Sequence, residues 1–426
     1  MREDLLHYIW MYKKFPKLDL TTSNGESVSI LHSGSHNKLS GPDFFNAQIR
    51  IDGQFWAGNV EIHINSSDWF AHNHQEDRNY DNVILHVVWN DDVSVYRPDG
   101  TNIPALELKN YVDSNLLGNY RNLMLTRDVG FINCSKDIDV VSNFDFNNWL
   151  ERLFIERLED KSKIIFSLLK EFNNDWEKVL FVLLLKNFGS KINGEAFFHI
   201  GKNFDFSIVR HLIEKPMELE SLLFGMGGLL QFDNITDSYY QELKKSFEYL
   251  SHKYNLDNTI ASSISFFKLR PNNFPTIRLS QFATLYAGTN NLFNSVMYCS
   301  DDELYNLFKI RASTYWDSHY TFGKVSKVSS KLLSTKFVEL LIINTIIPLR
   351  FCHQKRKGNP MNESLFSMIH GIKEESNNII DNYKNIGISV NSARDSQSLL
   401  QLYNNYCTKN KCLQCAVGAD LLNLKP

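Results

Sequence analysis

The sequence has few prolines, few cysteines and no long hydrophobic run. Ten prolines among 426 residues, together with 43% hydrophobic residues, exclude a disordered or fibrous chain. Six cysteines are too sparse for a disulfide-stapled scaffold of this length, and they fit a reducing compartment better. The most apolar run, from Val179 to Leu185, is far shorter than the roughly 20 residues that span a bilayer. We interpret this run as a buried core helix.

The chain also lacks a strong net charge, a secretory signal and the common nucleotide motifs. Its formal charge of -3 provides no global positive field for binding nucleic acid. The start, MREDLLHYIW, has no basic segment followed by an apolar stretch, so we expect a cytoplasmic protein without a membrane anchor. Walker, GxGxxG, GxSxG and HExxH motifs are missing, which leaves nucleotide-binding, serine-hydrolase and zincin activities without their usual anchors. The oligomeric state stays open.

The hydrophobic pattern changes its period along the chain. At this length we expect two domains, because single cores usually stop growing before it. The first part contains runs rich in Val, Ile and aromatic residues, separated by turns such as Asp52-Gly53. Between residues 149 and 168 the apolar residues recur at helical intervals of three and four. We predict an α+β protein with a β-rich domain over 1–135 and a mainly helical domain over 136–426.

Two acidic residues stand at the open end of the predicted hairpin. Asp43 precedes the first strand and Glu61 lies late on the second. Because the ends of hairpin strands converge, the two carboxylates are expected to hold one divalent ion. His63 lies two residues after Glu61 and therefore on the same face. The ordinary alternative is that Asp43 caps a turn and that Glu61 pairs with Arg50 or Arg78.

Histidines concentrate in the same region. Six of the thirteen fall from His32 to His86, and His7 lies upstream. The pair His72-x-His74 beside Asp77 has a spacing that suits a transition metal. His86 lies within an apolar run, where a hydrogen-bonded core role is the alternative to a ligand role. The predicted metal ligands are Asp43, Glu61, His72, His74 and Asp77.

The segment Gly41-Pro42-Asp43, the hairpin and Glu61-x-His63 together resemble the PD-(D/E)XK nuclease superfamily. The resemblance implies a restriction-endonuclease-like mixed sheet and a nuclease that acts on DNA or RNA, with the helical domain grasping the substrate. It implies that Asp43 and Glu61 bind Mg or Mn. His63 stands where the superfamily places a lysine, and it would act as a base or a third ligand. The predicted catalytic residues are Asp43, Glu61 and His63.

The whole chain is also similar to an uncharacterised bacterial domain-of-unknown-function family. The similarity is carried by GPDFFNAQI, GNVEIHINSSDWFAHNH, LRPNNFPTIRLSQFATL and the terminal YC-x4-C-x2-C-x2-G. It implies no activity. Two alternatives to a nuclease therefore stay open. One is a non-catalytic interaction module that keeps the fold, and the other is a metal-binding enzyme of another reaction type that uses His72, His74 and Asp77.

Three cysteines cluster near the end of the chain. The spacing of Cys407, Cys412 and Cys415 lets their thiolates converge on zinc or on an iron-sulfur cluster. A fourth ligand is missing from this run, and Cys352 or His353 could supply it. Some nucleases that resemble the same superfamily carry an iron-sulfur cluster that fastens the chain end to the nuclease core. The alternative is three buried, reduced cysteines that only pack.

Overall fold

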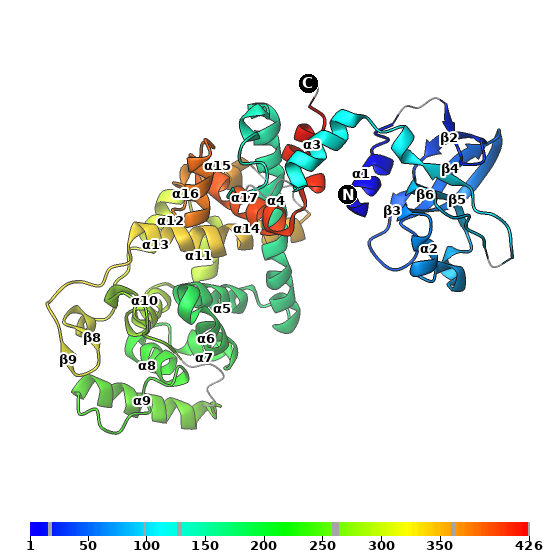
Figure 1. Ribbon diagram of the computed structural model, residues 1–426. Helices are drawn as coiled ribbons and strands as arrows, with labels where there is room; N and C mark the ends of the chain where they lie inside the picture. Colours follow the sequence, from blue (N-terminus) through cyan, green and yellow to red (C-terminus); the bar gives the residue numbers. More distant parts are fainter. Residues whose placement is uncertain (16–18, 98, 126–129, 258–263, 359–362, 425–426) are drawn as a thin grey trace. The chain divides into compact units, whose positions relative to one another are not determined.

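The computed structural model describes residues 1–15, 19–97, 99–125, 130–257, 264–358 and 363–424 (Figure 1). The chain divides into two compact units. Unit 1 consists of Met1–Leu150, Asp381–Ile388 and Leu400–Pro426, and unit 2 consists of Glu151–Ile380 and Ser389–Leu399. This division differs from the sequence-based boundary at residue 135. It falls within helix α4 (Asn143–Glu171), and the C-terminal residues join unit 1 because α18 (Ala416–Leu422) packs against α3 (Ser114–Leu125).

Unit 1 is built on a mixed β-sheet (Figure 1, blue). Within the described residues the sheet has seven strands in the order β1-β2-β4-β5-β6-β7, with β3 paired to β4. The pairs up to β4-β5 are antiparallel, whereas β5-β6 and β6-β7 are parallel. The strands are β1 (Leu20–Thr21), β2 (Ser27–His32), β3 (Ser35–His36), β4 (Phe44–Ile51), β5 (Gln54–Asn65), β6 (Val83–Asn90) and β7 (Ala105–Glu107). The predicted mixed sheet is confirmed.

The hairpin of β4 and β5 forms for local reasons. Ile51 pairs with Gln54, so the loop is the two residues Asp52 and Gly53, whose φ angles are 48° and 78°. Positive φ at both central residues is typical of the tight type I′ turn that matches the twist of the flanking strands. The turn predicted from Asp52-Gly53 is therefore confirmed.

Strand β6 is buried on both faces, and β5 approaches it closely. Every residue from Val83 to Val88 is buried. At Gly58, a Cβ atom would lie 2.5 Å from the side chain of Ile84 and 2.7 Å from the carbonyl oxygen of Asn82. Glycine therefore permits the parallel strands to pair at this point. Helices α1 (Glu3–Met11) and α2 (Asp68–Ala71) both pack on β5.

Unit 2 is mainly helical, as predicted. Its core includes the whole run from Val179 to Leu185, and no residue of that run is more than 6% exposed. The ring of Phe181 contacts the rings of Phe204, Phe206, Phe282 and Tyr286. The run is thus a core helix. The helices with all their residues in unit 2 are α5 (Trp176–Phe188), α6 (Ser190–Lys202), α7 (Phe206–His211), α8 (Pro216–Met226), α9 (Ser238–Tyr254), α10 (Pro275–Ala287), α11 (Leu292–Tyr298), α12 (Asp301–Leu307), α13 (Thr335–Leu341), α14 (Ile347–Arg356) and α15 (Glu363–Gly371).

In the described part of the chain, unit 2 also contains two short strands, and three helices cross the boundary between the units. Strands β8 (His319–Thr321) and β9 (Lys324–Val325) form a small hairpin in unit 2. Helices α16 (Asn378–Asn385) and α17 (Ala393–Asn405), like α4, contain residues of both units.

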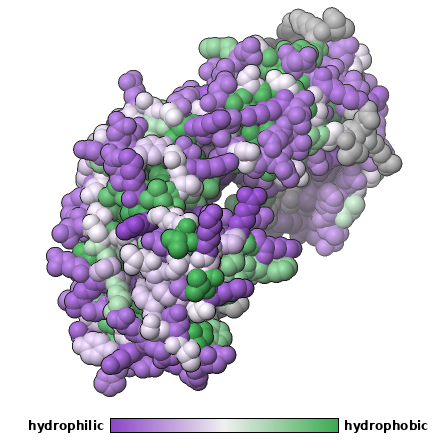
Figure 2. Space-filling view, turned by 90° about the vertical axis from the view of Figure 1, so that its left-hand side faces the viewer, coloured by the Kyte–Doolittle hydropathy of each residue, from purple (hydrophilic) through white to green (hydrophobic). Residues whose placement is uncertain are grey.

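Hydrophilic side chains take up most of the face in Figure 2, where the hydrophobic ones form small separate groups. None of the helices in the described ranges is long and apolar enough to cross a membrane.

Candidate functional site

The β4-β5 hairpin brings Asp43 and Glu61 together. The backbone N–H of Asp43 donates to Oε2 of Glu61 at 3.0 Å, and the N–H of Ile62 donates to Oδ2 of Asp43 at 3.1 Å. Each carboxylate is therefore fixed by the backbone of the opposite arm of the hairpin. Arg50, the alternative partner of Glu61, instead donates to the carbonyl oxygen of Gly53. Glu61 is only 4% exposed, so its carboxylate is held in a poorly solvated position.

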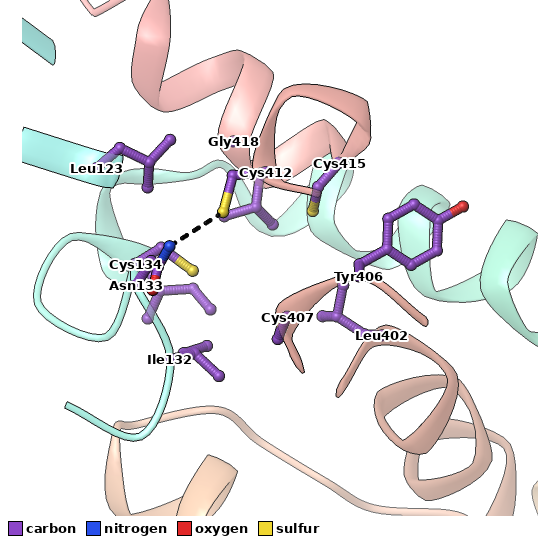
Figure 3. Close-up of a pocket in the computed structure, with 12 residues that line it drawn as sticks. Leu123, Ile132, Asn133, Cys134, Leu402, Tyr406, Cys407, Cys412, Cys415 and Gly418 are labelled. Carbon is purple, nitrogen blue, oxygen red and sulfur yellow. Dashed lines mark hydrogen bonds between the residues drawn. The ribbon is translucent and has the colours of Figure 1, made fainter. Parts of the chain in front are cut away.

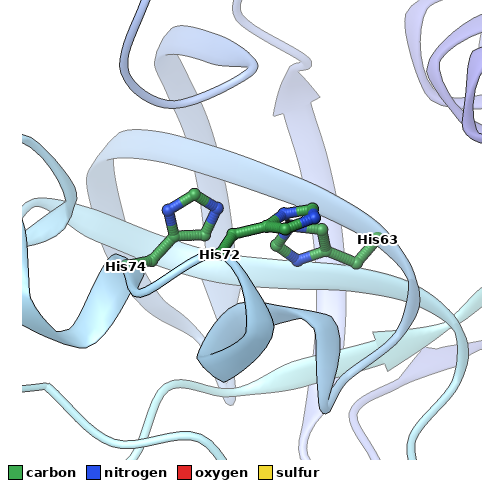
Figure 4. A group of neighbouring side chains, drawn as sticks. All are labelled: His63, His72 and His74. Atoms are coloured by element: carbon green, nitrogen blue, oxygen red, sulfur yellow. Dashed lines mark hydrogen bonds between the residues drawn. The ribbon is translucent and has the colours of Figure 1, made fainter.

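Three histidines converge beside this pair (Figure 4). One ligand atom of each of His63, His72 and His74 lies within 4.8 Å of the other two. His63 comes from β5, His72 follows α2, and His74 begins the short 3-10 helix η1 (His74–Glu76). The chain after β5 folds back through α2, and this places His72 and His74 over the strand that carries His63. The three nitrogens are a donor set that can hold a transition metal.

Glu61 lies directly against this histidine group. Its Oε1 is 3.2 Å from Nε2 of His74 and 3.6 Å from Nε2 of His63. Nε2 of His74 is buried, and it has no hydrogen bond of good geometry. A buried ring nitrogen that faces a carboxylate without such a bond fits a position in which both atoms bind one cation. The donor set of the site is thus three imidazoles and one carboxylate, with Asp43 adjacent.

Neighbouring rings fix the orientation of the histidine group. Nδ1 of His63 and Nε2 of His86 share a hydrogen bond of 2.9 Å, and His86 is fully buried. The ring of His74 stacks on Tyr80, with centroids 3.8 Å apart, and Trp69 contacts the rings of both His74 and His86. A second ring nitrogen held in this way sets the tautomer and orientation of a ligating histidine. His86 therefore occupies the place of a supporting partner behind His63.

The electrostatics keep the centre of the site uncharged when no cation is present. Burial, reinforced by the nearby Asp43 carboxylate, raises the pKa of Glu61 to about 9. Burial lowers the pKa of His63 to about 2 and that of His86 to about 3. Both rings are therefore neutral, which leaves a lone pair of His63 available to a metal ion. A bound cation would favour the ionised form of Glu61 and offset the cost of its burial.

A further histidine of the site comes from α1. Nε2 of His7 lies 3.1 Å from Oδ2 of Asp43, and the His7 side chain is 20% exposed. Burial by itself lowers the pKa of His7, but the contact with Asp43 and its charge raises that pKa overall. The sequence alone predicted no role for His7. Its spacing of four residues from Glu3, which places both on one face of α1, is the only local signal that could have suggested one.

Asp77 was predicted to be a metal ligand, but it is not part of the histidine group. It is exposed, and its carboxylate accepts a hydrogen bond from the backbone N–H of Asn79 at 2.9 Å, which caps the 3-10 helix η2 (Arg78–Tyr80). An aspartate two residues before a backbone N–H commonly forms such a local turn. His63 and Glu61 are thus the close neighbours of the His72-x-His74 pair, whereas the carboxylate of Asp77 bonds to the backbone.

The terminal cysteines lie at a second location in unit 1. Cys407, Cys412 and Cys415 line one pocket together with Cys134 (Figure 3). Cys134 is far from the other three cysteines in the sequence, and only the tertiary structure brings it to them. Of the two fourth ligands that were considered, Cys352 is buried in the core of unit 2 and His353 packs against Trp176 and two other aromatic rings of that unit.

Comparison with known proteins identifies the family of the chain. It belongs to the family described as Protein of unknown function (DUF2851), which matches residues 3–378. The matched range contains the histidine group and Cys134, and it ends before Cys407. No curated protein and no solved structure matches the chain. The expected similarity to an uncharacterised family is confirmed, and it assigns no activity.

Proposed function

We propose that unit 1 is a metal-dependent hydrolase that cleaves phosphodiester bonds in DNA or RNA. The observation that carries this proposal is the convergence of His63, His72 and His74 beside the carboxylate of Glu61. With three imidazoles and Glu61 as ligands, a water molecule or substrate would bind at a fifth position, as it sometimes does in catalytic zinc sites. His72 is the exposed member of the group, so the open position would face solvent on its side.

The donor set bears on the identity of the metal. The resemblance to PD-(D/E)XK nucleases implies Mg or Mn, but imidazole nitrogens suit zinc and iron better than magnesium. The three histidines therefore favour zinc over magnesium, and the adjacent carboxylates of Glu61 and Asp43 also suit manganese. When bound, such an ion polarises a phosphoryl oxygen and lowers the pKa of a water molecule.

Each of the surrounding residues would have a separate role in catalysis. Glu61 supplies the negative charge that offsets the ion, and the bond from the Asp43 N–H holds it in place. His7, partly exposed and oriented by Asp43, is the candidate for proton transfer at the edge of the site. His63 takes the position of the superfamily's lysine as a neutral ring. It is thus suited to bind the ion rather than to act as an ammonium.

The choice of phosphodiesters rests on the resemblance in the sequence. Gly41-Pro42-Asp43 precedes the hairpin and Glu61-x-His63 lies on its second strand, which resembles the arrangement in PD-(D/E)XK nucleases. The order of the β4-β5 hairpin, the short helix α2 and the parallel strand β6 supports the restriction-endonuclease-like interpretation of unit 1. Nucleic acid is accordingly the substrate that we propose for this site.

The test is hydrolysis by the full-length protein after chelation and reloading with one metal at a time. The substrates are single-stranded and double-stranded DNA, RNA and bis(p-nitrophenyl) phosphate. We expect cleavage with zinc or manganese, and loss of both metal and cleavage in His72→Ala and His74→Ala. His7→Ala should keep the metal and lose roughly 100-fold in rate, because general acid-base catalysis contributes about that much.

A matched control is His252→Ala, which removes an exposed histidine of α9 in unit 2 and should change neither property. If the wild-type protein binds the metal but cleaves none of these substrates, the hydrolase activity is refuted and unit 1 is a non-catalytic metal-binding module. Wild-type protein that binds neither zinc nor manganese would refute the proposed site altogether.

A further inference from the structure

Four cysteines that are far apart in the sequence meet in unit 1. Cys134 lies in the loop before α4, while Cys407, Cys412 and Cys415 lie in the segment between α17 and α18. The pocket that they share is small, with a cavity volume of about 20 Å³ (Figure 3). Its other walls are mainly apolar, with Leu123, Ile132, Ile138, Leu402 and Val417 among them. Four thiols therefore line one small and weakly solvated pocket.

Hydrogen-bond donors accompany the sulfur atoms. Nδ2 of Asn133 donates to Sγ of Cys412 at 3.6 Å, and the hydroxyl of Tyr383 lies 3.5 Å from Sγ of Cys407. Cys415 is the residue that precedes α18, and the backbone N–H groups of Val417 and Gly418 lie against its sulfur. Burial raises the pKa of all four thiols, and donors directed at sulfur act in the opposite sense by stabilising the thiolate, which is the ligand form of cysteine. Such donors also tune iron-sulfur clusters.

Gly418 allows α18 to pack closely against the segment that carries Cys412. A Cβ atom on Gly418 would lie 2.0 Å from the carbonyl oxygen of Cys412. Only glycine therefore lets the first turn of α18 rest against the short 3-10 helix η9 (Cys412–Gln414). This explains the glycine three residues after the last cysteine in YC-x4-C-x2-C-x2-G. The backbone between Cys412 and Cys415 is thus closely packed against α18.

The distances between the sulfur atoms favour an iron-sulfur cluster over a single zinc ion. In a tetrahedral zinc site, bonds of roughly 2.3 Å place the sulfurs about 3.8 Å apart. Throughout the described parts of the chain, the histidine group is the only set of three or more His, Cys, Asp or Glu ligand atoms within 4.8 Å of one another. No three of the four cysteine sulfurs are therefore that close. An iron-sulfur cluster spreads its four thiolates over several iron atoms and so accommodates a wider set.

We propose that Cys134, Cys407, Cys412 and Cys415 bind an iron-sulfur cluster whose role is to fasten the C-terminal segment to unit 1. The described residues of the segment also make other long-range contacts within that unit, among them the hydrogen bond from Nδ2 of Asn133 to Oδ1 of Asn410 and the ring contact of Trp149 with Tyr406. Nδ2 of Asn119 on α3 donates to the carbonyl oxygens of Leu422 and Leu424, and Asn423 donates to the hydroxyl of Tyr8. Tyr8 follows His7 on α1, so the cluster would also stabilise the helix that presents His7 to Asp43. The proposal does not depend on the hydrolase activity.

The test uses full-length protein purified without oxygen. Iron and acid-labile sulfide are measured together with the visible absorption spectrum and the electron paramagnetic resonance spectrum of the reduced protein. We expect iron and sulfide in comparable amounts in the wild type, and loss of both in Cys134→Ser. Cys299→Ser changes a cysteine of unit 2 and should keep them. Cys134→Ser should also unfold at a lower temperature than Cys299→Ser, because ligand binding to the native state contributes to its stability.

Three results would overturn the proposal. Zinc without sulfide would identify a single-ion site, and metal-free protein with four titratable thiols would identify packing cysteines. Iron and sulfide that persist in Cys134→Ser would remove Cys134 from the ligand set. If Cys134→Ser does not fold, the wild-type metal and sulfide content still decides between these cases.

Discussion

Asp43 and Glu61 are bound to each other through the backbone, because the N–H of Asp43 donates to Oε2 of Glu61 at 3.0 Å. The reciprocal bond from Ile62 to Asp43 holds the second carboxylate in the same way. These bonds fix the positions of both acids without a metal ion. Glu61 then directs its other oxygen, Oε1, toward His74. The hairpin thus preorganises the acidic side of the candidate site, and the histidines provide its other side.

We expect His63→Lys to abolish metal binding. His63 is only 1% exposed and lies against His72 and Glu61, so a lysine ammonium there would repel a cation at the same position. Metal content after reloading, measured by mass spectrometry, checks this. Cleavage that is preserved or increased in His63→Lys would instead show that the position acts as the lysine of PD-(D/E)XK nucleases.

His86→Leu should weaken metal affinity about 10- to 100-fold, which is the usual effect of removing a residue that orients a ligating histidine. The substitution removes the partner of Nδ1 of His63 and keeps an apolar side chain in the buried strand. Affinity is measured by competition with a chelator, with His252→Leu as the control. An unchanged affinity in His86→Leu would show that His86 only packs.

Glu220→Gln should stabilise the protein near neutral pH. Glu220 is buried on α8, and burial raises its pKa above the ordinary value of 4.5. Trp316 donates to it at 2.7 Å, and Tyr239 is the titratable neighbour that faces it from α9. The folded state therefore binds more protons than the unfolded state between the two pKa values, so stability falls as pH rises through that interval.

Urea denaturation at a series of pH values measures this effect. Glu220→Gln should show a smaller decline in the free energy of unfolding between acidic and neutral pH than the wild type. Glu248→Gln alters an exposed carboxylate of α9 and should follow the wild-type curve. Identical curves for Glu220→Gln and the wild type would mean that Glu220 ionises in the folded protein without cost.

Gly418→Ala should lower the melting temperature and reduce any iron bound by the cysteines. The added Cβ would lie 2.0 Å from the carbonyl oxygen of Cys412, so η9 and α18 would have to move apart. The matched control is Gly118→Ala on α3, where a Cβ meets no atom within 4 Å. That change should be neutral or stabilise by up to about 1 kcal/mol, because alanine favours a helix over glycine. Equal melting temperatures for the two variants would contradict the expected clash.

The elements that depend on neighbouring residues could be predicted from the sequence. The Asp52-Gly53 turn and the alternation of the flanking strands determine the hairpin, which in turn brings Asp43 near Glu61. The run from Val179 to Leu185 forms a core helix for a similar reason, since its apolar residues exclude a solvent-facing stripe. His72 and His74 could be predicted as metal ligands from their spacing. Asp77 shared that spacing, but its carboxylate bonds the backbone two residues on.

The tertiary structure decided which distant residues meet in the two candidate sites. His63 joins His72 and His74 because the chain turns back over β5 after α2, and His7 reaches Asp43 from a helix that precedes the sheet. Cys134 meets the terminal cysteines only when the last helix, α18, packs on α3. The sequence thus determined the mixed sheet, the helical unit and the residue types of both candidate sites. Which residues meet was decided by the packing of distant segments, because the free energy of burying their apolar faces depends on the whole fold and not on local spacing.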